Sequence, residues 1–157
     1  MILGGTGHQE LTDPGGWRSL KSLLAGMLEQ LPTPLVGITS LAAGADQLFA
    51  SEILKRGGRL RVVVPFPEYA DRFSGKDRTR YRRLLRAAVD AVVLPRVGSD
   101  EDCYMAAGHY IVDHCECLVA IWDGQPARGL GGTADVVAYA RRRAVPVKRV
   151  DASPWRS

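Results

Sequence analysis

The sequence lacks any long apolar run and holds few cysteines, and both absences exclude whole classes of protein. No stretch approaches the roughly 18 consecutive apolar residues that a membrane-spanning helix needs. The N-terminus reaches glycine after Met1-Ile2-Leu3 and has neither the basic nor the apolar region of a secretory signal. The three cysteines, Cys103, Cys115 and Cys117, are an odd set without a second Cys/His pair at zinc-ligand spacing. We therefore expect a cytoplasmic protein with reduced thiols, no metal site and no membrane partner.

Two common nucleotide-binding signatures are missing as well. The sequence contains no G-x-G-x-x-G with an acid on the second strand, and no G-x-x-x-x-G-K-[ST]. The first absence argues against an ordinary dinucleotide dehydrogenase, and the second against a P-loop NTPase. No cofactor is predicted.

The chain has 157 residues, 46% of them hydrophobic, which suits one well-buried core and is too little for two ordinary domains. We expect one domain over residues 1–150 and a polar, loose tail over residues 151–157. The net charge of +4 suits an anionic small molecule or a nucleic acid and does not choose between them. On a helix, Arg78, Arg82 and Arg86 would share the wet face. These arginines have two interpretations: an ordinary solvent-exposed helix face, or a surface that binds a polynucleotide.

Apolar runs and amphipathic stretches alternate along the chain. The expected strands are residues 2–3, 35–39, 60–65, 91–94, 118–122 and 145–150, and the expected helices are residues 17–31, 43–56, 78–89, 100–115 and 134–143. Continuously apolar strands separated by helices imply a parallel sheet covered on both faces. The pattern therefore predicts an α/β, Rossmann-like doubly wound domain with sheet order 3-2-1-4-5-6 and its switch point between strands one and four.

Three glycine-bearing loops are expected at one edge of that sheet, after strands one, two and five. The candidate ligand-binding residues in them are Gly5, Thr6, Gly7, His8, Ser40, Gly44, Ala45, Asp46, Gly131, Gly132 and Thr133. Glycine lets the backbone approach a phosphate, and the free N–H groups of a first helical turn attract negative charge. One glycine pair alone would indicate only a tight turn. Three such loops together predict a phosphate or sugar site.

Several of these side chains have two interpretations. His8 either hydrogen-bonds a ligand or belongs to a surface loop. Asp46 lies in the first turn of the second helix, where an acid stabilises the helix dipole, so that role competes with binding a ribose hydroxyl. Asp135 has the same ambiguity in the fifth helix. Tyr69 and Phe73 are interpreted as packing residues or as part of a lid.

Three segments carry a resemblance to a known family: residues 37–46 (GITSLAAGAD), residues 61–66 (RVVVPF) and residues 131–135 (GGTAD). With them the chain resembles the SLOG superfamily, named for the Smf/DprA and Lonely Guy proteins, over residues 2 to about 150. The resemblance implies a Rossmann-like fold, frequent dimers and one of three activities. Lonely Guy enzymes cleave nucleoside monophosphates to base and ribose phosphate, other members sense nucleotide-derived ligands, and DprA-type members bind single-stranded DNA.

The match to the Lonely Guy motif, P-G-G-x-G-T-x-x-E, is incomplete. The residue three positions after Thr133 is Val136, and the nearest acid, Asp135, comes one position early with a shorter side chain. Arg128 either clamps a phosphate or is a solvated loop charge. Asp135 and Arg128 are the candidate catalytic residues, and their spacing does not support hydrolysis.

The hypothesis that follows is a nucleotide-binding module or sensor for a small phosphorylated, nucleotide-like ligand. The first alternative is a nucleoside monophosphate phosphoribohydrolase. Single-stranded DNA binding ranks third, and a nucleic acid is not the expected partner, because the basic helix has no interleaved aromatic residue besides Tyr81. As a sensor the protein would act through a homo-oligomer or through an effector protein encoded separately.

Overall fold

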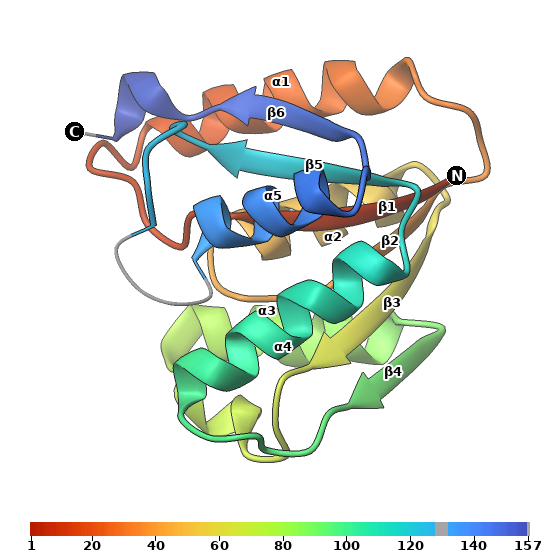
Figure 1. Cartoon of the computed structure of the whole chain (residues 1–157). Helices are drawn as coiled ribbons and strands as arrows, with labels where there is room; N and C mark the ends of the chain where they lie inside the picture. Colours follow the sequence, from red (N-terminus) through yellow and green to blue (C-terminus); the bar gives the residue numbers. More distant parts are fainter. Residues whose placement is uncertain (128–131, 157) are drawn as a thin grey trace.

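A computed structural model describes residues 1–127 and 132–156 (Figure 1). The strands are β1 (Ile2–Gly7), β2 (Val36–Thr39), β3 (Arg59–Val64), β4 (Asp90–Val93), β5 (Cys117–Trp122) and β6 (Val147–Asp151). The α-helices are α1 (Gly16–Glu29), α2 (Ala45–Lys55), α3 (Gly75–Ala87), α4 (Asp100–Asp113) and α5 (Thr133–Arg142). Two short 3-10 helices, η1 (Tyr69–Arg72) and η2 (Ser153–Trp155), complete the described chain. Every expected helix and strand is present.

The six strands form one parallel sheet in the order β4-β3-β2-β1-β5-β6. This confirms the α/β Rossmann-like fold class, but the predicted order was wrong in the position of strand four. β4 pairs with β3 at the sheet edge, so β1 pairs with β5 and the switch point lies between those two strands. The reason is burial: β4 begins at Asp90 and is largely exposed, whereas all six residues of β5 are buried and suit the interior of the sheet.

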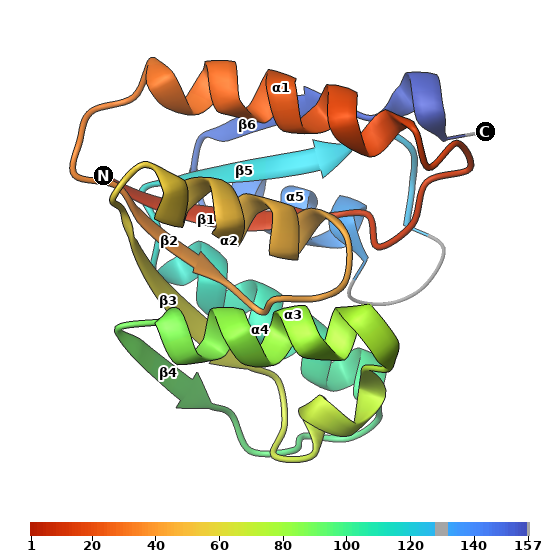
Figure 2. The same ribbon diagram turned by 180° about the vertical axis from the view of Figure 1, so that it is seen from behind.

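Helices cover both faces of the sheet. α1, α2 and α3 lie on one face, and α4 and α5 lie on the other (Figures 1 and 2). On the first face, leucines of α1 such as Leu20 and Leu24 pack with Phe49 of α2. On the second face, Ile111 of α4 packs with Val136 of α5. No helix in the described part of the chain is long and apolar enough to cross a membrane.

β1 is longer than predicted and contains the glycines that were expected to form a loop. A Cβ atom on Gly5 would overlap the Phe49 ring, and one on Gly7 would overlap the Cβ of Ala45. These glycines therefore let α2 pack directly on the strand. The expectation of a glycine turn after residue 3 was wrong, because periodicity alone does not show how closely a helix approaches a strand.

The C-terminal segment is packed, in contrast to the expected loose tail. A Cβ atom on Gly16 would overlap Trp155, which packs against the core under α1. The Asp13 N–H donates to the Trp155 carbonyl oxygen at 3.1 Å. Arg156 Nη1 donates to the Glu10 carbonyl oxygen at 2.8 Å. The last residues thereby reach the carboxyl edge of the sheet.

Candidate ligand-binding site

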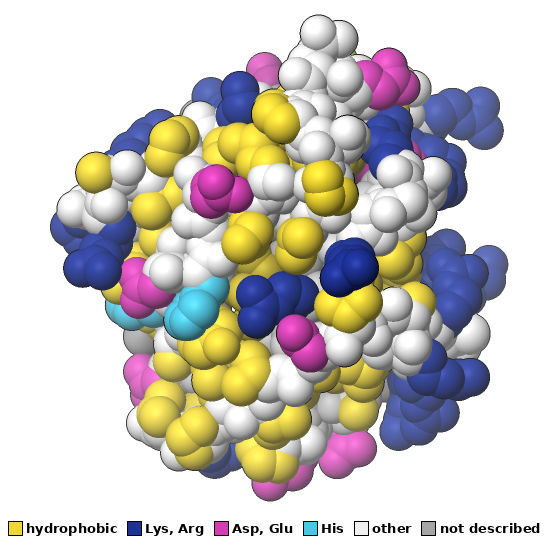
Figure 3. Space-filling model, turned by 90° about the vertical axis from the view of Figure 1, so that its right-hand side faces the viewer, with side chains coloured by type: hydrophobic (Ala, Val, Ile, Leu, Met, Phe, Trp, Pro, Cys, Tyr) yellow, Lys and Arg dark blue, Asp and Glu magenta, His cyan; other side chains and the backbone are white. Residues whose placement is uncertain are grey.

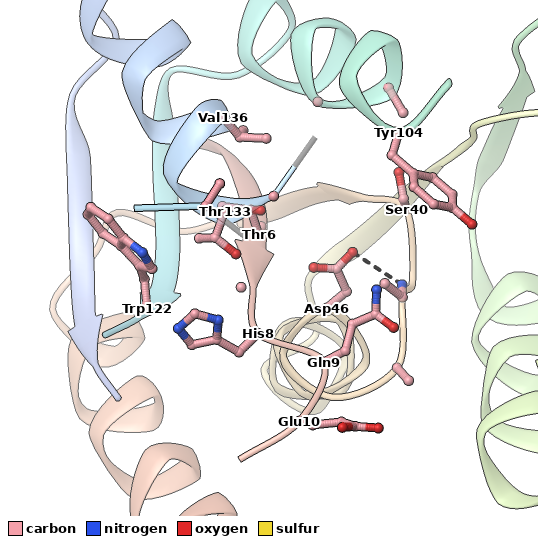
Figure 4. Close-up of a pocket in the computed structure, with 18 of the residues that line it drawn as sticks. Thr6, His8, Gln9, Glu10, Ser40, Asp46, Tyr104, Trp122, Thr133 and Val136 are labelled. Atoms are coloured by element: carbon pink, nitrogen blue, oxygen red, sulfur yellow. Dashed lines mark hydrogen bonds between the residues drawn. The ribbon is translucent and has the colours of Figure 1, made fainter. Parts of the chain in front are cut away.

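A cavity of about 820 Å³ opens at the carboxyl edge of the sheet, next to the β1–β5 switch point (Figure 4). Its lining comes from β1 and the loop behind it, from the loops after β2, β3 and β5, and from α4 and the start of α5. Eight predicted site residues line it: Gly5, Thr6, Gly7, His8, Ser40, Asp46, Gly132 and Thr133. Segments far apart in the sequence thus meet where ligands bind in doubly wound folds.

The remaining predicted residues do not line the cavity or lie outside the described part of the chain. Ala45 is fully buried against β1, and Gly44 adopts a φ of 80° where a Cβ atom would overlap the carbonyl oxygen of Gln9. Asp135 is not a lining residue, although Ala134 beside it is. Arg128 and Gly131 lie outside the described residues.

One corner of the cavity joins the predicted residue His8 to two side chains that were not predicted, Asp123 and Arg156. The Asp123 N–H donates to His8 Nε2 at 3.0 Å, and the same nitrogen lies 3.2 Å from Asp123 Oδ1. Arg156 Nε lies 3.5 Å from Asp123 Oδ2. Burial would raise the pKa of Asp123, but a hydrogen bond from the Gln125 N–H, together with the neighbouring His8 and Arg156 side chains, outweighs burial and lowers the pKa. Asp123 is therefore an ionised group that positions the His8 and Arg156 side chains.

Asp46 occupies the cavity floor between the ends of β1 and β2. Only 7% of the residue is exposed, and its Oδ2 accepts a hydrogen bond from the Ala42 N–H at 3.2 Å (Figure 4). Burial raises the pKa of Asp46 from 3.8 to about 7, although the Ala42 N–H and the Thr39 hydroxyl act in the opposite direction. This carboxyl group therefore titrates near neutral pH in a buried position.

Aromatic side chains form another wall. Tyr69 and Phe73 are buried, with ring centroids 5.0 Å apart, which confirms that they are packing residues. Tyr104 of α4 lies 6.0 Å from the Phe66 ring and also lines the cavity. Tyr104 was not predicted as a site residue, because the pattern of a helix does not show that one end of α4 faces a cavity.

The described lining carries more acidic than basic groups. The acidic residues are Glu10, Asp46, Asp77, Glu101 and Asp123, and the arginines are Arg72 and Arg156. Arg72 is bound to Asp100, with its Nε 2.7 Å from Asp100 Oδ2. A ligand with many negative charges would be repelled, so the cavity suits a small ligand of limited charge.

A separate basic surface lies on α3. Arg82, Arg83 and Arg86 are exposed, and none of them has an ion pair with another described residue. Figure 3 shows Lys and Arg side chains gathered along the flank that carries α1, α2 and α3. The solvent-exposed face predicted for this helix is present. Arg78 is partly covered, and its Nη2 lies 4.0 Å from Asp71 Oδ1.

Comparison with known proteins gives structural neighbours only. No protein-family model and no curated protein matches the chain. DNA processing protein A (DprA) from Streptococcus pneumoniae is similar with a TM-score of 0.65 and 19% identity, over 94% of this chain and 49% of that one. DprA from Helicobacter pylori, in a structure that addresses its single-stranded DNA binding mode, is similar with a TM-score of 0.67 and 10% identity. This match covers 98% of this chain and 70% of the Helicobacter pylori chain.

The chain thus spans about half the length of the Streptococcus pneumoniae protein. At these identities the likeness establishes the fold and leaves the activity open. The chain has a Rossmann-like fold similar to that of these two DprA structures.

Proposed function

We propose that the chain binds a small phosphorylated, nucleotide-like ligand in this cavity and acts as a binding module. The observation that carries the proposal is convergence: Thr6, Asp46 and Thr133 come from three separate segments and line one cavity at the switch point. α5 begins after Gly132, and no side chain of the described residues caps it, so the N–H groups of Thr133 and Ala134 are available to an anion. A ligand phosphate fits at this helix start.

Hydrolysis is less well supported than binding. Val136 stands where the Lonely Guy motif has its glutamate, and this valine lines the cavity (Figure 4). An apolar side chain cannot exchange a proton with a ribose or a water molecule. Asp123, a cavity acid whose pKa is lowered, is bound to His8 and Arg156. As a sensor, the protein would pass its signal to a second copy or to an effector protein.

Thermal-shift measurements with nucleoside monophosphates, dinucleotides and cyclic nucleotides test the proposal. A ligand present at about 100 times its Kd should stabilise the protein by roughly 2.7 kcal/mol. Thr133→Val should reduce the shift, while Thr79→Val, on the outer surface of α3, should not. If no nucleotide shifts the transition, the proposal fails. Chromatography of the same mixtures would reveal free base, and its release would favour the hydrolase instead.

Single-stranded DNA binding along α3 is the second candidate. It is supported by the exposed Arg82, Arg83 and Arg86 and by the likeness to a DprA structure that addresses single-stranded DNA. Each phosphate contact contributes about 0.7 to the slope of log affinity against log salt for single strands. Replacing Arg82, Arg83 and Arg86 together with glutamine should therefore lower the slope of log affinity against log salt by about 2. Arg141→Gln and Arg142→Gln on α5 serve as the control, and absence of binding at low salt would remove this candidate.

A further inference from the structure

We propose that Asp46 selects the sugar of the ligand: its carboxylate accepts hydrogen bonds from ribose hydroxyls, so the cavity prefers ribonucleotides to deoxyribonucleotides. This inference rests on the proposed function and adds the class of ligand to it. It also separates the cavity from the second candidate, because DNA lacks the 2′-hydroxyl.

The first argument is that the Asp46 carboxylate has hydrogen-bond acceptor positions that no described residue uses. A carboxylate offers about four acceptor positions. Within the described chain, Asp46 accepts hydrogen bonds only from the Ala42 N–H and from the Thr39 hydroxyl. The side chain lies at the cavity near Thr6 and Ser40, whose hydroxyl groups can donate and accept (Figure 4). The remaining acceptor positions are therefore available to donors of a ligand.

The second argument is that no cation accompanies the buried Asp46 carboxylate among the described residues. No ion pair joins Asp46 to a described lysine, arginine or histidine, and a buried carboxylate without a cation is unfavourable. Tyr69 is a nearby titratable group, and burial together with the charge of Asp46 raises its pKa, so it stays neutral. A phosphate would be repelled at this position. Neutral hydroxyl donors would instead stabilise the carboxylate without adding charge.

The third argument is the division of the cavity into two ends. The start of α5 lies on the β5 side, and the N–H groups of its first turn attract an anion. Arg156 on the same side offsets the charge of Asp123, with which it pairs. Asp46 lies on the β2 side, where the described lining holds hydroxyl groups and a carboxylate. A nucleoside monophosphate has the matching polarity, with a phosphate at one end of its ribose and hydroxyl groups at the other.

Isothermal titration with AMP, GMP, CMP and UMP and with their 2′-deoxy counterparts tests the inference. A hydrogen bond to a charged group predicts about a 10- to 100-fold preference for the ribose form. Asp46→Asn should reduce this ratio to below about 3 while affinity for the deoxy form stays similar. Asp135→Asn is the matched control, since Asp135 also lies in the first turn of a helix but does not line the cavity.

The outcomes separate the two proposals. Equal binding of both sugar forms by the unmodified protein, or an unchanged ratio in Asp46→Asn, would overturn the role of Asp46 and leave the proposed function standing. Binding of no nucleotide would overturn both. The 2′-O-methyl nucleotides test the unmodified protein directly, so the result does not depend on the folding of a variant: weak binding supports the inference, and binding equal to that of the ribose form contradicts it.

Discussion

Replacing Asp46 with asparagine should make the protein more stable at neutral pH. The folded-state pKa is about 7, above the ordinary value of 3.8. Between these two values the folded chain holds a proton that the unfolded chain has lost, so the free energy of unfolding falls as the pH rises from about 4 to 7. At about 1.4 kcal/mol for each pH unit, the loss reaches about 4 kcal/mol above pH 7.

Asparagine removes this loss because it does not titrate. Its amide oxygen can still accept the hydrogen bond from the Ala42 N–H that Asp46 Oδ2 accepts at 3.2 Å. The two proteins should therefore have similar stability near pH 4, and the variant should gain progressively as the pH rises. Urea unfolding at pH 4.5, 6 and 7.5, followed by tryptophan fluorescence, measures the difference. With a slope near 2 kcal/mol per molar, about 4 kcal/mol corresponds to a midpoint increase of about 2 M.

Two results would refute this reasoning. One is a variant that is less stable than the unmodified protein at pH 7.5. The other is a difference in stability that does not change between pH 4.5 and 7.5. Either would show that the carboxylate serves the fold, through the loop at Ala42 and the dipole of α2, and that burial does not disfavour its charged form. Other titrating groups, including Asp123, are shared by both proteins and cancel in the difference.

Three further substitutions, one of them with a matched control, test the packing and capping that hold the site in place. Gly5→Ala should lower the free energy of unfolding by about 1–3 kcal/mol, because the new Cβ would overlap the Phe49 ring. The control Gly26→Ala places its Cβ in open space within α1 and should raise the free energy of unfolding by up to about 1 kcal/mol. Equal effects of the two substitutions in urea unfolding would contradict the tight β1–α2 contact. Trp155→Ala should release the C-terminal segment, detected as faster amide hydrogen exchange around it, and unchanged protection would count against that packing. Ser99→Ala should cost about 1 kcal/mol in thermal unfolding, because the Ser99 side chain accepts from the Asp102 N–H at 3.2 Å in a capping box, and no loss would argue that the box is unimportant.

Local patterns predicted the helices and strands well because each pattern reflects burial of one element. The apolar run of β5 and the stripe of α4 identify buried residues wherever the neighbouring elements lie. The same patterns cannot show which strand pairs with which. β4 is largely exposed in the structure, yet an exposed strand can lie at either edge of a sheet, and the place of β4 beside β3 follows from strand pairing.

The candidate site was predicted in part for a related reason. The predicted residues lie in the segments that follow the carboxyl ends of strands, and these ends share one edge of a parallel sheet: His8 follows β1, Ser40 and Asp46 follow β2, and Thr133 follows β5. Arg156 could not be found in this way, since it reaches the cavity only because Trp155 packs against α1 and brings the C-terminus back.

The sequence by itself determined the alternation of strands and helices, the parallel sheet and the edge at which polar loops gather, because these depend on local periodicity and chain connectivity. Tertiary structure alone decided that Gly5 is a packing residue, that β5 pairs with β1, and that the pKa of Asp46 is raised to about 7. Each of these depends on distances between segments remote in the sequence. Burial, close approach and pKa are properties of the assembled neighbours, so a pattern within one segment cannot contain them.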